Sequence, residues 1–471
     1  MKKSGLGYWM REVLRQADNA SATFAPDPVH DLRVALRRCR SLAEGLQAID
    51  PDPAWKKMRK EGKQLFANLG SLRDCQVMME WIEKLGATDD PVAQRLMSYC
   101  KNQEQSSKAE AAQALQDFNR KQWENSIEFL SRRSTLLPAG GPPFQCLALE
   151  GWQEARKLHS IALKTRNKEG LHRLRIGVKK FRYLVENFLP QIYRQWAEGL
   201  KGIQDLLGEI HDLDVLWDVA LGAGVFETVE DRRRWSETIE AQRKQRVEKY
   251  RETMLGKHSL WQLWREGLPQ GEEAADAVFA KLQSWASFLD EDIQHTRRVT
   301  RLSLQLHDGL VRVGVLAMEE PGSRNLLRAA AITHDVGDGE TGADRRKNTQ
   351  RLVRKLHLPF GWNLEDLETT ALVARYHRGP LPGTQKRFLA LTDQAQRRTK
   401  VLAGILRLAD AFDRNHQGKV VRLKISRTGD FVTIQAVGLD EHSPLMQKIA
   451  GARHLLETTC NVPMIVRPLS L

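Results

Sequence analysis

An internal duplication constrains the fold of this chain more than any other feature of its sequence. The segment His30–Arg40 reappears as His172–Arg182, at an offset of 142 residues. A second block, Leu69–Val77, matches Leu207–Val215 at an offset of 138. Two ordered blocks with nearly equal offsets indicate a tandem repeat, in which each copy is one structural unit.

Both copies are predicted to be helical, because apolar residues such as Leu32 and Leu36 recur at helical spacing. We expect the copies to span about 1–137 and 144–255. The breaker-rich segment Pro138–Pro143 lies between them and marks the joint.

Each copy carries a compact stripe of basic residues on the helix predicted for its first repeated block. At about 100° per residue the stripe residues fall within an arc of roughly 80°. They are His30, Arg33, Arg37 and Arg40 in the first copy, and His172, Arg175, Lys179 and Arg182 in the second. Like charges at this spacing destabilise a helix unless something neutralises them. A solvated basic face is the alternative, but such faces usually mix signs, so we favour binding of a polyanion.

Composition agrees with an anionic partner and excludes several other classes of protein. The 471 residues include 73 Lys and Arg against 59 Asp and Glu, a net charge of +14. No apolar run approaches the length of a membrane span, and no secretory signal pattern opens the chain. The five cysteines are scattered without a C-x-x-C pair, which favours a reduced, cytoplasmic protein without membrane contact.

The duplicated pattern H-x-x-R-x-x-x-[RK]-[RK]-x-R, followed by L-G-x-x-[RH]-D-x-x-V, resembles the CHAD domain family over about residues 1–255. The resemblance implies two related helical bundles around a basic channel that binds inorganic polyphosphate. By position, the implied ligand contacts are His30, Arg33, Arg37, Arg38, Arg40, Lys63, His172, Arg175, Lys179, Lys180, Arg182 and Lys201. The copies differ in that Gln76 stands where the second copy has Asp214.

The second half of the chain carries a different set of polar residues. A single histidine, then an adjacent His-Asp pair, then a distant Asp form the ligand set of HD-type metal-dependent phosphohydrolases. The candidate metal ligands are His295, His334, Asp335 and Asp410, and the candidate phosphate contacts are Arg298, Arg301, His377 and Arg378. Imidazoles and carboxylates suit a divalent ion such as Mn²⁺, Mg²⁺ or Fe²⁺. The alternative is ordinary polar surface, since a lone His-Asp pair is common.

The motifs around His334, His377 and Asp410 closely resemble the C-terminal region of exopolyphosphatase and guanosine pentaphosphate phosphatase, from about residue 276 onward. In that family this region lengthens the path of polyphosphate and supports dimerisation. Two departures argue against hydrolysis. The catalytic nucleotide-fold domains have no counterpart here, and a His-rich stretch of the family is replaced by Arg345–Thr349.

The sequence therefore predicts a mainly α protein. A duplicated helical-bundle CHAD domain (1–255) is followed by a linker (256–275), an all-α HD-like domain (276–416) and a small C-terminal α/β subdomain (417–471). Within the last we expect strands at 420–426, 431–437 and 463–467, and a helix at 444–458.

Three functions remain open from the sequence. The leading one is a cytoplasmic polyphosphate-binding protein, because both halves indicate the same polyanion. The second is a metal-dependent phosphohydrolase acting on polyphosphate or a phosphorylated nucleotide; whether the chain is an enzyme stays undecided. A nucleic-acid binder is the third, and it lacks both a recognisable motif and aromatic residues among the basic stripes. The resemblance also allows a homodimer.

Overall fold

The computed structural model of the chain describes residues 5–22, 24–165, 167–316, 322–337, 344–380 and 382–469. The fold is mainly α-helical with a small three-stranded sheet near the C-terminus, which confirms the predicted class. The chain divides into two compact units, Met1–Ala277 and Val278–Leu471. Within the described ranges, every helix is too short or too polar to cross a membrane.

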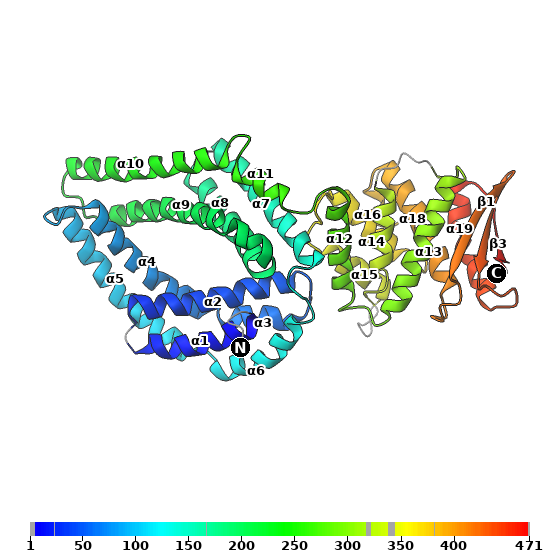
Figure 1. Cartoon of the computed structure of the whole chain (residues 1–471), viewed down its shortest axis with the longest axis horizontal. Helices are drawn as coiled ribbons and strands as arrows, with labels where there is room; N and C mark the ends of the chain where they lie inside the picture. Colours follow the sequence, from blue (N-terminus) through cyan, green and yellow to red (C-terminus); the bar gives the residue numbers. More distant parts are fainter. Residues whose placement is uncertain are drawn as a thin grey trace. The chain divides into compact units, whose positions relative to one another are not determined.

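The first unit consists of helices only in its described part, and they form two sets. The first set is α1 (Leu6–Ser21), α2 (Pro26–Gln47), α3 (Pro53–Glu61), α4 (Lys63–Leu85), α5 (Pro91–Gln116) and α6 (Arg120–Ser134). The second set is α7 (Pro142–Thr165), α8 (Lys168–Phe188), α9 (Pro190–Gly222), α10 (Val229–Met254) and α11 (Leu260–Glu266). In Figure 1 the first set is coloured blue to cyan and the second cyan to green.

The two sets have matching helices. Helices α5 and α10 both contain 26 residues, and their first residues are Pro91 and Val229, at the offset seen in the sequence. Helix α2 packs on α1 and α4, and its counterpart α8 packs on α7 and α9 in the same way. One difference is that α3 and α4 meet at Gly62, whereas the corresponding residues run continuously through α9.

The segment expected as a linker, 256–275, contains the short helix α11. Trp261 of α11 packs against α7 and is 2% exposed, and Trp264 is fully buried. Trp123 of α6 lies at the same offset of 138 and is also buried. The second repeat therefore ends with α11, and a seven-residue helix is too short for its periodicity to be recognised in the sequence.

The two sets also contact each other through the helices that carry the repeated motifs. Helix α2 packs against α8, and α4 packs against α9. Apolar residues fix both members of the first pair in their own bundles, since Leu32, Leu36, Leu174 and Val178 are fully buried. Their basic stripes are consequently brought near the contact between the repeats.

Helix α12 (Gly271–Ala286) spans the division between the units. The second unit continues with α13 (Ile293–Arg312), α14 (Ser323–Thr333), α15 (Arg345–Arg354), α16 (Leu364–Arg375), α17 (Lys386–Leu389) and α18 (Asp393–Phe412). Helices α13, α14, α16 and α18 pack pairwise on one another. Their buried faces form one core with the sheet.

The C-terminal α/β piece agrees with the sequence prediction to within about two residues at most element ends. Strands β1 (Arg422–Thr428) and β2 (Phe431–Val437) form an antiparallel hairpin. Helix α19 (Leu445–Cys460) then leads to β3 (Met464–Leu469), which pairs parallel to β2. Helix α19 packs on α18, and β1 packs on α13. The sheet therefore lies against the α13 side of the helical core (Figure 1).

Candidate functional site

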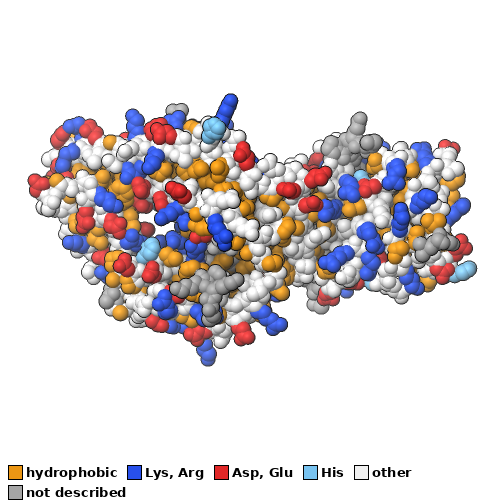
Figure 2. Space-filling view, in the orientation of Figure 1, with side chains coloured by type: hydrophobic (Ala, Val, Ile, Leu, Met, Phe, Trp, Pro, Cys, Tyr) orange, Lys and Arg blue, Asp and Glu red, His pale blue; other side chains and the backbone are white. Residues whose placement is uncertain are grey.

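Two groups of polar residues predicted from the sequence are brought together by the fold, one in each unit. In the first unit they lie on α2 and α8. Each helix buries its apolar face in its own bundle, and the basic residues are left half-buried or exposed on the remaining faces. Figure 2 shows Lys and Arg side chains gathered around a hollow in the first unit.

Four of the twelve predicted contacts form a cationic cluster drawn from both repeats, which we call the inter-repeat cluster: Arg33, Arg37, Arg175 and Lys179. The pKa of Lys179 is lowered to about 8, first by burial and then by the positive charges of Arg37 and Arg175. Arg33 acts in the same direction, and Asp74 offsets part of the effect. Cations from both copies are thus close enough to repel each other.

The members of the inter-repeat cluster form no close ion pair with a described residue. The carboxyl group of Asp74 lies nearby: burial raises its pKa, and the charges of Arg33 and Arg175 act to lower it. Within the described residues, none of the four forms an ion pair shorter than 4.0 Å, in contrast to their neighbours on the same helices. The Nη1 atom of Arg33 is buried and has no hydrogen-bond partner there. A buried donor without an acceptor costs about 1–3 kcal/mol, so an anion that supplied oxygen atoms would stabilise this arrangement.

The other stripe residues are engaged differently. Arg38 of α2 forms an ion pair with Glu186 of α8 and donates to Asn187 at 3.4 Å. In the opposite direction, Lys180 of α8 lies 3.8 Å from Glu44 of α2. These residues therefore connect the two repeats, and their charges are already balanced.

Arg40 and Arg182, at the end of each stripe, are also partnered. Arg182 Nε lies 3.7 Å from Glu186, and Arg40 donates to the carbonyl oxygen of Arg59 at 3.2 Å. The predicted lysine contacts, Lys63 and Lys201, are both exposed and occupy matching positions in the two repeats.

The histidines that begin the stripes occupy different environments. His30 is exposed, and its pKa is lowered by partial burial and by the charges of Arg73 and Arg37. His172 is half-buried, with its Nδ1 3.4 Å from Nδ1 of His211. The pKa of His211 is lowered to about 4 by burial and by Arg175, so this ring is neutral at pH 7.

The second block of the motif supports the stripe from α4 and α9. A Cβ atom on Gly70 would lie 2.8 Å from Nη1 of Arg33, so the glycine makes room for the guanidinium group. The matching Gly208 has open space beside it. The two repeats differ at Asp214, which stands where the first repeat has Gln76. The charge of Asp214 is balanced, because Arg243 of α10 donates to its carboxylate at 2.9 Å.

A cavity of about 440 Å³ lies beside the second block, between α4, α9 and α10. Asp212 lines it together with Arg73 and Trp81. Burial raises the pKa of Asp212 to about 6, although Arg175 acts to lower it. The cluster therefore borders a carboxylate that titrates close to neutral pH.

In the second unit, the ends of four helices bring the predicted metal ligands together. His295 lies in the first turn of α13, and His334 and Asp335 follow α14 directly. His377 lies just beyond the end of α16, and Asp410 lies in the last turn of α18. All five are at least 94% buried.

The three imidazole rings point their Nε2 atoms into this cluster. Nδ1 of His334 donates to the carbonyl oxygen of Ala331 at 2.8 Å, and Nδ1 of His377 donates to that of Ala374 at 2.5 Å. A carbonyl oxygen can only accept, so Nδ1 of each of these two rings carries a proton, and in the neutral ring Nε2 presents a lone pair. Nδ1 of His295 donates to the carboxylate of Asp413 at 2.8 Å, which orients the third ring.

Around Asp335 lie the Nε2 atoms of His334, His377 and His295, at 3.3, 3.4 and 3.6 Å from its oxygens. Hydrogen bonds from these rings would satisfy a metal-free cluster. Among the described residues, however, the three Nε2 atoms and Asp335 Oδ1 are buried without a hydrogen-bond partner. One ligand atom each from His295, His334 and Asp335 lies within 4.8 Å of the others. The donor types and spacing fit a divalent metal ion.

Asp410 is engaged by arginines. Arg378 donates to it with both Nη2, at 2.7 Å, and Nε, at 3.2 Å, and Arg414 forms a further ion pair. His295 Nε2 lies 3.3 Å from the same carboxylate. Asp410 thus borders the metal-type cluster, but its charge is shared with two guanidinium groups. His377, predicted as a phosphate contact, instead contributes a ring nitrogen that has no hydrogen-bond partner among the described residues.

The electrostatics keep the carboxylates ionised. Burial alone would raise the pKa of Asp335, but His334 and His377 hold it well below its usual range. Burial likewise acts to lower the pKa of His295, yet Asp410 and Asp413 outweigh it and raise the value to about 9. A positive charge, either a proton or a metal ion, therefore belongs at the centre of this cluster.

The predicted phosphate contacts Arg298 and Arg301 lie away from the centre of the cluster. Arg298 Nε donates to Asp413 at 2.7 Å and its Nη2 to the carbonyl oxygen of His416 at 3.1 Å. Arg298 therefore orients Asp413, which in turn orients His295. Arg301 is exposed on α13.

Sequence reasoning missed the roles of Asp413 and of three arginines near Asp410, namely Arg346, Arg407 and Arg414. Asp413 and Arg414 follow Asp410 by three and four residues, a spacing that could have indicated a shared face at the C-terminal end of α18. Arg346 comes from a different helix, so only the tertiary structure brings it close.

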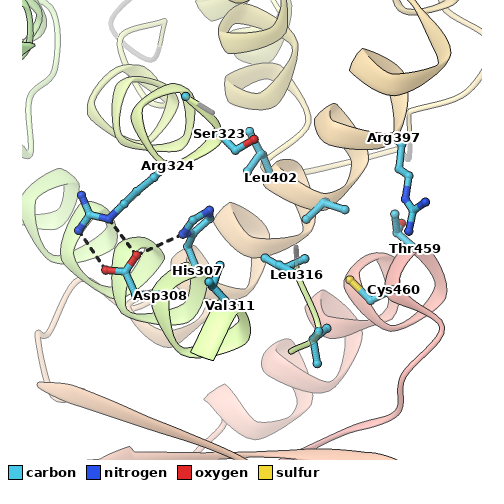
Figure 3. A pocket seen from close by; sticks show the side chains of 13 residues that line it. His307, Asp308, Val311, Leu316, Ser323, Arg324, Arg397, Leu402, Thr459 and Cys460 are labelled. Atoms are coloured by element: carbon cyan, nitrogen blue, oxygen red, sulfur yellow. Dashed lines mark hydrogen bonds and ion pairs between the residues drawn. The ribbon is translucent and has the colours of Figure 1, made fainter. Parts of the chain in front are cut away.

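A separate cavity of about 530 Å³ lies at the opposite end of α13 and contains none of the predicted residues. Asp308 on its wall accepts from Arg324 at 2.8 and 3.0 Å and lies 3.2 Å from His307 (Figure 3). The charge of Asp308 is balanced within the wall, and Arg397 on the opposite side also lines the cavity.

Comparison with known proteins assigns both parts of the chain. Residues 9–221 match the CHAD domain family, and residues 280–443 match domain III of the Ppx/GppA phosphatase family, which confirms both resemblances. A crystal structure of the CHAD domain from the plant Ricinus communis aligns at 20% identity and a TM-score of 0.39. That alignment covers 56% of this chain and 93% of the plant chain. No curated protein matches the chain.

Proposed function

Since the chain joins a CHAD domain to a Ppx/GppA domain III, we propose that it binds inorganic polyphosphate through the inter-repeat cluster of its first unit. The observation that carries this proposal is a set of cations supplied equally by the two repeats, which form no ion pair with any residue that the structure describes: Arg33, Arg37, Arg175 and Lys179. Guanidinium groups meet two phosphate oxygens at once, and a linear polyanion offers such oxygens repeatedly.

Aromatic residues near the cluster favour polyphosphate over nucleic acid. Phe66 lies under the guanidinium groups of Arg33 and Arg40, with 5.2 Å from each to the ring centroid. Tyr183 lies 5.9 Å from Arg37 in the same manner. These rings already contact arginines, which leaves less ring surface for a nucleobase, whereas single-stranded nucleic acids bind by stacking.

Titration of the full chain with polyphosphate and with DNA of equal charge tests this proposal. We expect tighter binding of polyphosphate, an affinity that falls steeply with salt, and tighter binding of longer chains. Equal affinity for both polymers, or no polyphosphate binding at low salt, would contradict it.

A second candidate function is supported by the His–Asp cluster of the second unit. A divalent ion such as Mn²⁺, Mg²⁺ or Fe²⁺ would be held by atoms that lack a hydrogen-bond partner among the described residues. These atoms are Nε2 of His295, His334 and His377, and Oδ1 of Asp335. When bound, such an ion supplies Lewis-acid polarisation of a phosphoryl group. The chain itself orients the rings through Asp413 and two backbone carbonyls and keeps Asp335 ionised. We therefore keep phosphoanhydride hydrolysis as the alternative activity.

Metal analysis of the purified full chain separates these alternatives. His295→Ala should lower bound metal at least tenfold, because it removes one ligand and the partner of Asp413. His442→Ala is the matched control, since His442 is exposed in the C-terminal subdomain. Metal content that is the same in both variants would refute the metal site, and phosphate release from polyphosphate then shows whether the metal-loaded protein is an enzyme.

The cysteines support the cellular location that we propose for the protein. All five are free thiols in the structure, and Cys39, Cys100 and Cys146 are buried. Free thiols suit a reducing compartment, so we place the protein in the cytoplasm.

A further inference from the structure

A group of arginines lies beside the His–Asp cluster and converges on Gly379. Arg407 of α18 donates to the carbonyl oxygen of Gly379, and the guanidinium group of Arg346 from α15 occupies the space where a Cβ would be. Gly379 also has a φ of 75°, a conformation that favours glycine. The residue is thus required both for the turn and for the approach of Arg346.

Two more arginines complete this group, which we call the Gly379 arginine cluster: Arg346, Arg378, Arg407 and Arg414. Arg378 immediately precedes Gly379, and both Arg378 and Arg414 contact Asp410. Four cations from three parts of the second unit are therefore gathered around one turn.

The charge of this cluster is only partly balanced. Arg346 pairs with Asp344 at 3.2 Å, and Asp410 is shared between two other members. Arg407 forms no ion pair with the described residues, and its Nη1 is buried there without a hydrogen-bond partner. Burial lowers the pKa of Arg407, and the charges of Arg346 and Arg414 lower it further. The environment therefore favours an added anion.

We propose that the Gly379 arginine cluster is a binding site for the terminal phosphate of a phosphoanhydride chain, placed next to the metal-type cluster. The inference deepens the second candidate function and rests on it. Asp410 joins the two features, because its carboxylate lies 2.7 Å from Arg378 Nη2 and 3.3 Å from His295 Nε2. A phosphate group held by the guanidinium forks lies beside the ion-binding position.

The segment 345–349, which differs from the His-rich stretch of the family, takes on a role in this proposal. Arg346 lies in the first turn of α15 and reaches Gly379 from there. Its arginine supplies charge to the phosphate site, so the replacement changes the segment from imidazole to guanidinium chemistry.

Calorimetric titration with inorganic phosphate tests the site in the full chain carrying Lys179→Glu, which silences the cluster of the first unit. We expect Arg407→Gln to weaken phosphate binding about tenfold, as the loss of one charge-assisted hydrogen bond does. Arg346→Gln should weaken it about fivefold and keeps the inference testable if the Arg407 variant unfolds. Arg422→Gln, on the exposed face of β1, is the matched control and should have no effect.

Several results would overturn the inference. They are an absence of phosphate binding in the Lys179→Glu chain, unchanged affinity in both arginine variants of the site, or an equal loss in Arg422→Gln. Long-chain polyphosphate binding by the chain without Lys179→Glu should change less than twofold on Arg407→Gln. Failure of the polyphosphate proposal would appear only in that second titration, so the two outcomes are distinguishable.

Discussion

The two repeats of the first unit share one motif and matching helices, yet they hold their charges differently. In the first repeat, Arg37 carries a permanent charge, and Arg73 is tied to Glu80 at 3.1 Å. In the second, the same positions are Lys179, whose pKa is lowered to about 8, and His211, whose pKa is lowered to about 4. The second repeat thus places a lysine that titrates near pH 8 where the first repeat has an arginine.

The same comparison separates two kinds of residue within each stripe. The first arginine and the following basic residue, Arg33 and Arg37 or Arg175 and Lys179, face one another without ion-pair partners among the described residues. The next basic residue, Arg38 or Lys180, bonds to a glutamate of the opposite repeat. Two basic residues of each stripe are therefore available to a ligand, and the residue that follows them joins the repeats.

The largest expected effect comes from reversing a charge among the residues that have no ion-pair partner in the described part of the chain. Arg37→Glu and Lys179→Glu should each weaken polyphosphate binding about a hundredfold, because a carboxylate enters a group of three cations. Lys180→Glu is the matched control, since Lys180 is exposed and already near Glu44. Fluorescence titration measures the affinities, and circular dichroism should show unchanged helix content. An equal loss in the control would mean that the stripe acts as a whole.

A change of pH should have a smaller effect on binding, and it should distinguish the two repeats. The pKa of Lys179 is lowered to about 8 in the free protein, so the side chain loses its proton as pH rises through this value. A polyanion binds the protonated form, and we therefore expect affinity to fall about fivefold between pH 7 and pH 9.5. Lys179→Arg should remove this dependence, because arginine stays charged. A dependence that persists in Lys179→Arg would assign it to another group.

The smallest effect concerns the paired glycines. Gly70→Ala should weaken binding about threefold, because a Cβ would lie 2.8 Å from Arg33 Nη1 and displace it. Gly208→Ala should leave binding unchanged and stabilise α9 by up to about 1 kcal/mol, since nothing lies within 4 Å of its Cβ position. Binding and thermal unfolding of the two variants provide the comparison, and identical behaviour would show that Arg33 is not held against α4.

Much of the architecture followed from local patterns. The repeat, its helices and the C-terminal strands each have a period or a breaker that the sequence displays, and the fold class follows from them. The resemblance to the HD-type ligand set also led us to expect that four candidate metal ligands would lie close together. The structure places His295, His334, Asp335 and Asp410 together.

The remaining features depend on contacts between distant segments. The pairing of Arg38 with Glu186 joins residues 148 positions apart, and nothing in the stripe itself separates Arg38 from Arg37. Arg346 and Arg407 likewise meet only at Gly379. Helical periodicity identifies a face but does not reveal which members of that face find a counter-ion.

The central claim is that both repeats contribute to one anion site, and stoichiometry tests it most directly. Isothermal titration with a short polyphosphate, in the full chain carrying Arg407→Gln to weaken the second unit, should give one site per chain. Arg37→Glu and Lys179→Glu should each weaken that single site about a hundredfold, because its cations come from both copies. Two sites per chain, each lost only on substitution in its own repeat, would contradict the account.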